Sequence, residues 1–125
     1  MGDLTKNFSY KEFACRCGCG LGIVDTELVK TLQSLRDSYH KAITITSGLR
    51  CPEHNRNAGG KITSSHLKGL AVDIACSSSA DRYMLLSKLV VYFNRIGIAK
   101  NFIHVDIDTE KSAGVIWTYP YKEEK

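Results

Sequence analysis

The stretch Leu70-Ala-Val-Asp-Ile-Ala75 has the length and apolar character of a buried β-strand, yet it contains one carboxylate, Asp73. An unpaired carboxylate costs several kcal/mol to bury, so Asp73 needs a cation beside it. His66 lies seven residues upstream, and Gly69 lies between the two. A chain that turns at this glycine returns the imidazole to the carboxylate, and we therefore predict that His66 and Asp73 share one metal ion.

A third candidate ligand lies in Phe102-Ile-His-Val-Asp-Ile107, a second apolar strand. Because side chains alternate along a strand, His104 and Asp106 point to the same face. Two histidines and one carboxylate form a common catalytic zinc set, which leaves a coordination position for a water whose pKa the metal lowers. The residues thus predict metal-assisted hydrolysis, although they leave open that each histidine is an ordinary core or surface residue and that Asp73 caps a turn.

The remaining segments predict an α+β fold. Ser9 and Glu12 have the spacing of a capping box at the start of a short helix, and Asp25 is placed to cap a longer one. The apolar pattern predicts the longest helix over residues 79–96 and strands over residues 42–46, 70–75, 102–107 and 115–119. Residues 51–65 are polar and predict a covering loop, in which Pro52 suits the first turn of a short helix. The last two strands have hairpin-like spacing, which indicates a small antiparallel β-sheet packed with helices.

Length and composition favour one domain over residues 1–125, with its core at about 8–119 and a flexible tail at 120–125. The net charge of +4 comes from scattered lysines, so we expect no nucleic-acid partner. No apolar run reaches the length of a membrane span, and the N-terminus has no signal-peptide pattern. We therefore expect a monomer that is cytoplasmic as synthesised.

Three motifs resemble, in order, those of the zinc D-Ala-D-Ala carboxypeptidase family. They are Ser47-Gly-Leu-Arg50, Ser64-Ser-His66-Leu-Lys-Gly69-Leu-Ala71-Val-Asp73 and Phe102-Ile-His104-Val-Asp106, and the resemblance covers about residues 8–119. That family includes phage cell-wall endopeptidases and vancomycin-resistance D,D-dipeptidases, and hedgehog-type domains share its scaffold. The resemblance implies a Zn²⁺ ion bound by His66, Asp73 and His104, a peptidoglycan stem peptide as substrate, and an endolysin-like action on the cell wall after release.

The same resemblance implies roles for two further residues. Arg50 would polarise the scissile carbonyl or hold a substrate carboxylate, for which its planar fork of donors is suited. The alternative is an arginine that only braces the loop. Ser64 would contact the substrate, or else would cap a turn.

The position three residues before the last histidine carries a catalytic Glu or Asp in some branches of the family, and here it is Asn101. An asparagine cannot accept a proton from water, so we predict that Asp106 is the catalytic base. Its alternative role is to accept a hydrogen bond from a ligand imidazole. If no base is present, the chain is a non-catalytic zinc-containing binding module.

Five cysteines are present, and three of them fall within five residues. Cys15, Cys17, Cys19 and Cys51 are candidates for either a structural metal site or a disulfide that ties the N-terminal loop to the Arg50 motif. Free buried thiols are the alternative, because the cluster lacks a C-x-x-C spacing. A cysteine-rich metal-binding interaction domain over residues 15–51 is thus a third reading of the chain.

Overall fold

The structure is a computed structural model and describes residues 2–16, 24–57 and 64–119. The elements are α1 (Tyr10–Phe13), α2 (Thr26–Tyr39), β1 (Ile45–Ser47), α3 (Pro52–Asn57), the 3₁₀ helix η1 (Ser65–Lys68), β2 (Ala71–Ala75), α4 (Ser79–Tyr92), β3 (Arg95–Ile98), β4 (Phe102–Asp106) and β5 (Val115–Thr118). Over these residues the strands form one sheet in the order β1-β2-β4-β3-β5. All neighbouring pairs are antiparallel except β3 and β5, which confirms the α+β class and makes the sheet mixed.

Local capping explains where the helices begin. The Glu12 carboxylate accepts a hydrogen bond from the Ser9 backbone N–H at 2.6 Å, as the predicted capping box requires. The Asp25 side chain accepts from the N–H groups of Glu27 and Leu28 and so opens α2.

No helix in the described part of the chain is both long and apolar enough to cross a membrane.

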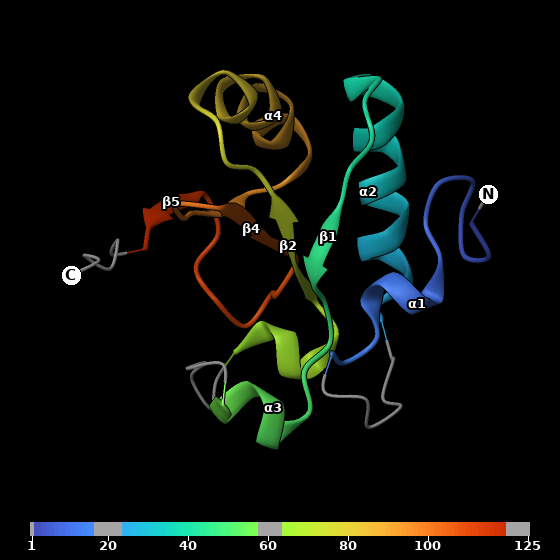
Figure 1. The fold of residues 1–125 in the computed structure, drawn as a ribbon. Helices are drawn as coiled ribbons and strands as arrows, with labels where there is room; N and C mark the ends of the chain where they lie inside the picture. The colour runs from blue at the N-terminus through green and yellow to red at the C-terminus, as the bar shows by residue number, and fades with distance from the viewer. Residues whose placement is uncertain (1, 17–23, 58–63, 120–125) are drawn as a thin grey trace.

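The two faces of the sheet differ in character. One face packs against α2 and α4 and supplies the core, with buried side chains from Val72, Ile74, Ile96, Ile103 and Val105. The other face presents the alternate residues of the same strands, and its middle row runs through Ser47, Asp73, His104, Gly97 and Trp117. In Figure 1, α3 lies at the opposite end of the molecule from α4. The polar candidates therefore lie on the face that the two long helices leave open.

The predicted helix over residues 79–96 is wrong at its C-terminal end. Helix α4 ends at Tyr92, Phe93 is extended with φ −125°, and β3 follows at once. Ile96 is buried, but it enters the core from a strand, and Val90, an apolar residue of the helix itself, is 50% exposed. An apolar run without Gly or Pro before the strand has no local signal that separates a helix from a following strand.

The predicted hairpin between the last two strands is also wrong. β3 lies between β4 and β5, and β5 runs parallel to β3 instead of pairing with β4. The backbone carbonyl of Asn94 accepts hydrogen bonds from the N–H groups of Gly114 and Val115, which fixes the start of β5 beside the start of β3. The sequence did not predict β3, and β3 takes the place beside β4 that was predicted for β5.

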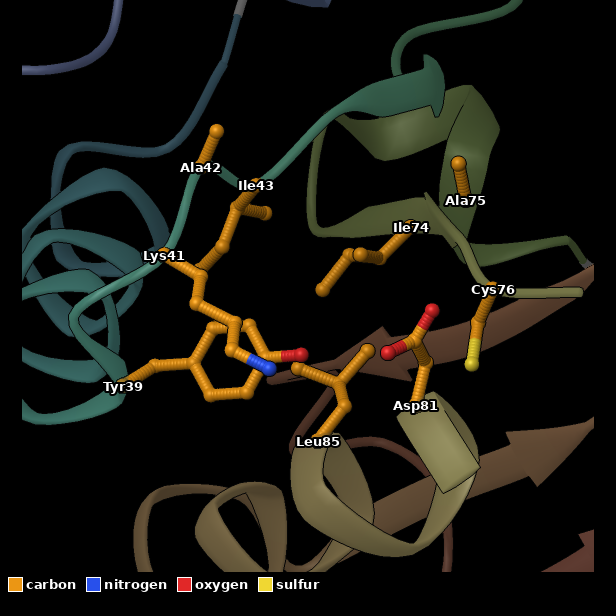
Figure 2. Close-up of a pocket in the computed structure, with 9 residues that line it drawn as sticks. All are labelled: Tyr39, Lys41, Ala42, Ile43, Ile74, Ala75, Cys76, Asp81 and Leu85. Atoms are coloured by element: carbon orange, nitrogen blue, oxygen red, sulfur yellow. The ribbon is translucent and has the colours of Figure 1, made fainter. Parts of the chain in front are cut away.

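A pocket of about 160 Å³ opens on the helix side of the sheet, between the end of α2, the end of β2 and the start of α4 (Figure 2). Tyr39, Cys76 and Asp81 are among its lining residues. Burial raises the pKa of the Cys76 thiol, which therefore stays protonated near neutrality. Ile74 also lines this pocket, while the adjacent Asp73 points to the other face. The pocket is therefore separate from the candidate site.

Candidate metal centre

The turn that carries His66 over β2 forms as its sequence predicts. Ser64 caps η1, because its hydroxyl accepts a hydrogen bond from the His66 N–H at 3.2 Å. Gly69 ends the turn with φ 71°, a left-handed conformation that glycine adopts without strain. β2 follows immediately and brings Asp73 back beside the imidazole. Ser64 thus has the turn-capping role in this structure, and its predicted substrate contact stays a prediction.

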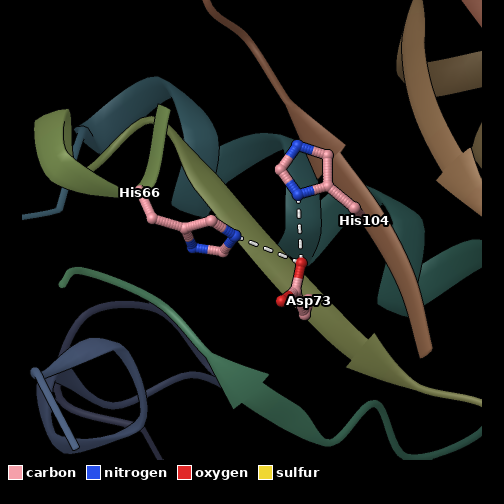
Figure 3. A group of neighbouring side chains, drawn as sticks. All are labelled: His66, Asp73 and His104. Carbon is pink, nitrogen blue, oxygen red and sulfur yellow. Dashed lines mark hydrogen bonds and ion pairs between the residues drawn. The ribbon is translucent and has the colours of Figure 1, made fainter. Parts of the chain in front are cut away.

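His66, Asp73 and His104 converge on one point, as Figure 3 shows. Asp73 Oδ1 lies 3.2 Å from His66 Nε2 and 3.0 Å from His104 Nδ1. One candidate ligand atom from each residue lies within 4.8 Å of the other two. Cross-strand pairing of Asp73 with His104 explains the second contact, because directly opposed residues on one face of a sheet place their side chains together.

The outer ring nitrogens decide whether these residues suit a metal ion. His66 Nδ1 lies 2.7 Å from the carbonyl oxygen of Gly48, and His104 Nε2 lies 2.8 Å from Asp106 Oδ2. Both partners accept hydrogen bonds, so each outer nitrogen carries the proton. In the neutral rings the inner nitrogens are then lone pairs aimed at a carboxylate. Three converging electron-pair donors require a cation between them, and the set fits a divalent metal ion.

Electrostatics support the same interpretation. When no metal ion is bound, burial acts to raise the pKa of Asp73, but hydrogen bonds donated by His104 and His66 outweigh it and bring this pKa to about 2. Burial acts to lower the pKa of His104, while its hydrogen bonds with Asp106 and Asp73 raise it overall. Asp73 therefore stays ionised at any physiological pH. When no metal ion is bound, a proton on His104 supplies the positive charge that the carboxylate needs.

Asp106 lies behind His104 and is fully engaged there. Its Oδ2 accepts from His104, and its Oδ1 accepts from Arg95 Nε at 2.7 Å and from the Asp108 N–H at 3.1 Å. The residue is 1% exposed. Burial acts to raise its pKa, but the hydrogen bond from His104 and the backbone N–H of Asp108 lower it. Its carboxylate thus contacts the side of the imidazole that faces away from Asp73.

Arg50 lies beside the triad, at the end of β1. Its Nη2 is 3.4 Å from Asp73 Oδ2, its Nε donates to Ser47 Oγ at 3.2 Å, and its Nη1 donates to Asn55 Oδ1 at 3.2 Å. The side chain is 15% exposed, so part of it remains accessible. The backbone N–H of Arg50 donates to the His66 carbonyl, which couples its loop to the turn of the first ligand.

Sequence reasoning did not find the group of polar and charged residues that holds η1 against the segment after β4. Ser65 Oγ donates to Asp108 Oδ2 at 2.7 Å, and Lys68 Nζ contacts the same carboxylate at 3.0 Å. The Asp108 side chain is completely buried. The contact joins the residue that precedes His66 to the segment that follows Asp106. Its signal in the sequence was only a third Asp two positions beyond Asp106.

The structure describes two of the four cysteines that were predicted to act together, Cys15 and Cys51. Cys15 is buried, and its sulfur accepts a hydrogen bond from the Cys51 N–H at 3.4 Å. The Leu49 N–H donates to the Phe13 carbonyl at 2.8 Å, so α1 does lie against the Arg50 loop. Cys17 and Cys19 lie outside the described residues. The structural metal site or disulfide therefore stays a prediction.

Residues 6–106 match the sequence profile of the peptidase M15 family. The chain belongs to the peptidase M15 family. Both histidines and the aspartate of the triad fall within the matched region, and the resemblance inferred from the three motifs is thus confirmed. M15 enzymes are metallopeptidases, and a His-Asp-His triad consistent with a metal ion is in place. No curated protein sequence matches the chain.

Proposed function

We propose that this M15 peptidase uses a zinc ion at His66, Asp73 and His104 to hydrolyse a peptide bond in peptidoglycan stem peptides, as a D-Ala-D-Ala carboxypeptidase or a cell-wall endopeptidase. The observation that carries the proposal is the pair of outer hydrogen bonds, to Gly48 and Asp106, which turn both inner nitrogens toward Asp73. Two nitrogens and one oxygen are a donor set that zinc accepts in hydrolytic enzymes. When bound, zinc supplies a Lewis acid that polarises a carbonyl and acidifies water.

Arg50 is the residue best placed to bind the substrate. Its guanidinium contacts Asp73 Oδ2, the oxygen that does not contact the histidines. Its hydrogen bonds to Ser47 and Asn55 fix the plane of the guanidinium. A fixed fork of N–H donors beside a metal ligand suits a carbonyl oxygen or a carboxylate. We propose that Arg50 orients the scissile carbonyl or holds the terminal carboxylate of the substrate.

Asp106 is the residue whose proposed role changes. Both of its oxygens are occupied behind His104, so taking a proton from water in the site would require breaking a buried contact. We propose that Asp106 orients His104 and fixes its tautomer, as carboxylates behind metal-bound histidines do. Asn101 is exposed in the turn between β3 and β4 and offers no carboxylate in its place.

The test is to load the purified protein with zinc and incubate it with defined muropeptides, both monomeric pentapeptides and cross-linked dimers. Mass analysis of the products identifies the bond that is cut. Loss of a terminal D-Ala is expected of a carboxypeptidase, and separation of cross-linked stems is expected of an endopeptidase. His66→Ala should abolish cleavage. His40→Ala is the matched control and should leave cleavage unchanged, since His40 caps the end of α2.

A non-catalytic binding module is the second candidate, and the engagement of Asp106 together with Asn101 favours it. In that case the zinc-loaded protein binds muropeptides but does not cleave them. Calorimetry with the same substrates distinguishes the two functions. Stoichiometric zinc with binding and without products would refute hydrolysis and support the module.

A further inference from the structure

The row of residues that carries the metal centre contains one position without a side chain. Gly97 pairs with His104 on one side and with Trp117 on the other. A Cβ atom at Gly97 would lie 2.6 Å from Trp117 Nε1 and 2.7 Å from Tyr119 Cε2. The two aromatic side chains therefore occupy the space that any other residue at position 97 would fill, and they extend from the edge strand across β3 toward the ligand histidine.

Contacts on several sides fix this aromatic pair. The His104 ring centroid lies 5.5 Å from that of Trp117 and 6.4 Å from that of Tyr119. The Arg95 guanidinium stacks over Trp117 at 5.0 Å, and the Tyr119 ring contacts Phe102 at 5.6 Å. These distances suit tilted and edge-to-face aromatic contacts. The pair is thus a rigid wall against one ligand of the metal.

The position of Tyr119 in the sheet places it across the site from Arg50. Arg50 follows β1 at one edge of the sheet, and Tyr119 follows β5 at the other edge. Its backbone N–H donates to the Ile98 carbonyl at 2.9 Å, which continues the pairing with β3. Its Cε2 atom, next to the carbon that bears the hydroxyl, lies over Gly97, and Gly97 pairs with His104, so the hydroxyl end of the ring is turned toward the centre.

The phenol has a proton to donate there. An ordinary tyrosine is protonated near neutrality. The neighbouring group that interacts with the hydroxyl is the Trp117 indole, whose N–H can only donate. The Tyr119 oxygen is then an acceptor toward Trp117, and its own O–H is directed elsewhere. Among the described residues no hydrogen-bond acceptor takes that proton, although the ring itself is well packed.

We propose that Tyr119 is a catalytic residue whose O–H donates a hydrogen bond to the substrate oxygen that gains negative charge as the peptide bond is attacked, from the side opposite Arg50. This inference rests on the proposed hydrolytic function. In the reaction, water adds to the carbonyl carbon, the C–N bond breaks, and the amine leaves with a proton. Tyr119 keeps its own proton throughout, so its role is to stabilise developing charge.

The test compares Tyr119→Phe with Tyr83→Phe, a matched change at a site that is 74% exposed on α4. Three quantities are measured: zinc stoichiometry, kcat and KM on a muropeptide that the wild-type protein cleaves, and the Kd of a phosphinate analogue of D-Ala-D-Ala. For Tyr119→Phe we expect unchanged zinc, a kcat about 10–100-fold lower with little change in KM, and phosphinate binding weakened about tenfold. Tyr83→Phe should match the wild type in all three.

Equal kcat and equal phosphinate affinity in Tyr119→Phe and the wild type would overturn the inference. Loss of zinc or a large drop in melting temperature would also overturn it, because Tyr119 would then serve packing. If the wild-type protein cleaves no muropeptide, the proposed function fails, and the phosphinate measurement still decides the role of the hydroxyl. Failure of the wild-type protein both to bind the phosphinate and to cleave any muropeptide would refute both proposals.

Discussion

Replacing Asp106 with asparagine separates the two roles that its carboxylate has been given. The side chain keeps its shape but has one acceptor oxygen in place of two. If that oxygen faces Arg95 and the Asp108 N–H, the new NH₂ group faces His104 Nε2. The imidazole must then present a lone pair outward and an N–H toward the metal centre, which removes it as a ligand.

The opposite orientation of the amide is no better. With its oxygen toward His104, the NH₂ group faces the Arg95 guanidinium, which also only donates. The partly buried Arg95 then loses a charge-assisted hydrogen bond, which is worth about 1.5–3 kcal/mol. Loss of a partner behind a metal-bound histidine typically weakens metal binding about 10–100-fold, or about 1.4–2.7 kcal/mol. We therefore expect Asp106→Asn to bind zinc at least tenfold more weakly than the wild type.

Competition with a chromophoric zinc chelator near pH 7.5 measures this affinity directly. Asp37→Asn is the matched control, because Asp37 is exposed on α2 and far from the site in its contacts. Activity of Asp106→Asn at saturating zinc should recover in part if Asp106 only orients His104. Zinc affinity within about twofold of the wild type, together with cleavage lost by several orders of magnitude, would identify Asp106 as the base and refute the orienting role.

Three further predictions follow from the geometry. His66→Ala should lower bound zinc, measured by elemental analysis, to well below one equivalent, while His40→Ala should retain it; retention in both would exclude the triad as the zinc site. Gly97→Ala should destabilise the fold by about 1–3 kcal/mol in urea unfolding, because its Cβ would clash with the β5 aromatic side chains, and an unchanged midpoint would contradict that packing. The raised pKa of His104 means that, in metal-free protein, its contribution to stability is complete below about pH 6.5 and is lost as pH rises through the folded-state value, whereas zinc removes this contribution to the slope. The same dependence of melting temperature on pH with and without zinc would disprove the assignment.

The part of the centre that the sequence predicted well is local. His66 and Asp73 are seven residues apart, and Gly69 between them adopts the left-handed turn that their approach needs. Burying a carboxylate in an apolar strand has a large cost wherever that strand lies, so the need for a cation was visible without any tertiary information. His104 was found in the same way, since its strand pattern is apolar on both sides.

The rest depended on a strand that the sequence did not reveal. β3 follows α4 after two residues, and its apolar residues continue the helical pattern, so no local signal marks the change. Without β3, one cannot predict the contact between Arg95 and Asp106. One also cannot predict that Trp117 and Tyr119 pack over Gly97. The register of the sheet also decides which side chains contact the Asp106 carboxylate, and register depends on residues far apart in the sequence.

Charge pairing around the centre bears on what the site attracts. Two carboxylates of the centre each have an arginine partner: Asp73 pairs with Arg50, and Asp106 pairs with Arg95. These pairs are mutually neutral, and both imidazoles are neutral once their inner nitrogens bind metal. The positive charge of a bound divalent ion is then left uncompensated in a site whose ligands are no more than 6% exposed. Because such a charge is poorly screened when buried, the centre favours groups that are anionic or become so, and a terminal carboxylate or the oxygen of an attacked carbonyl meets that requirement.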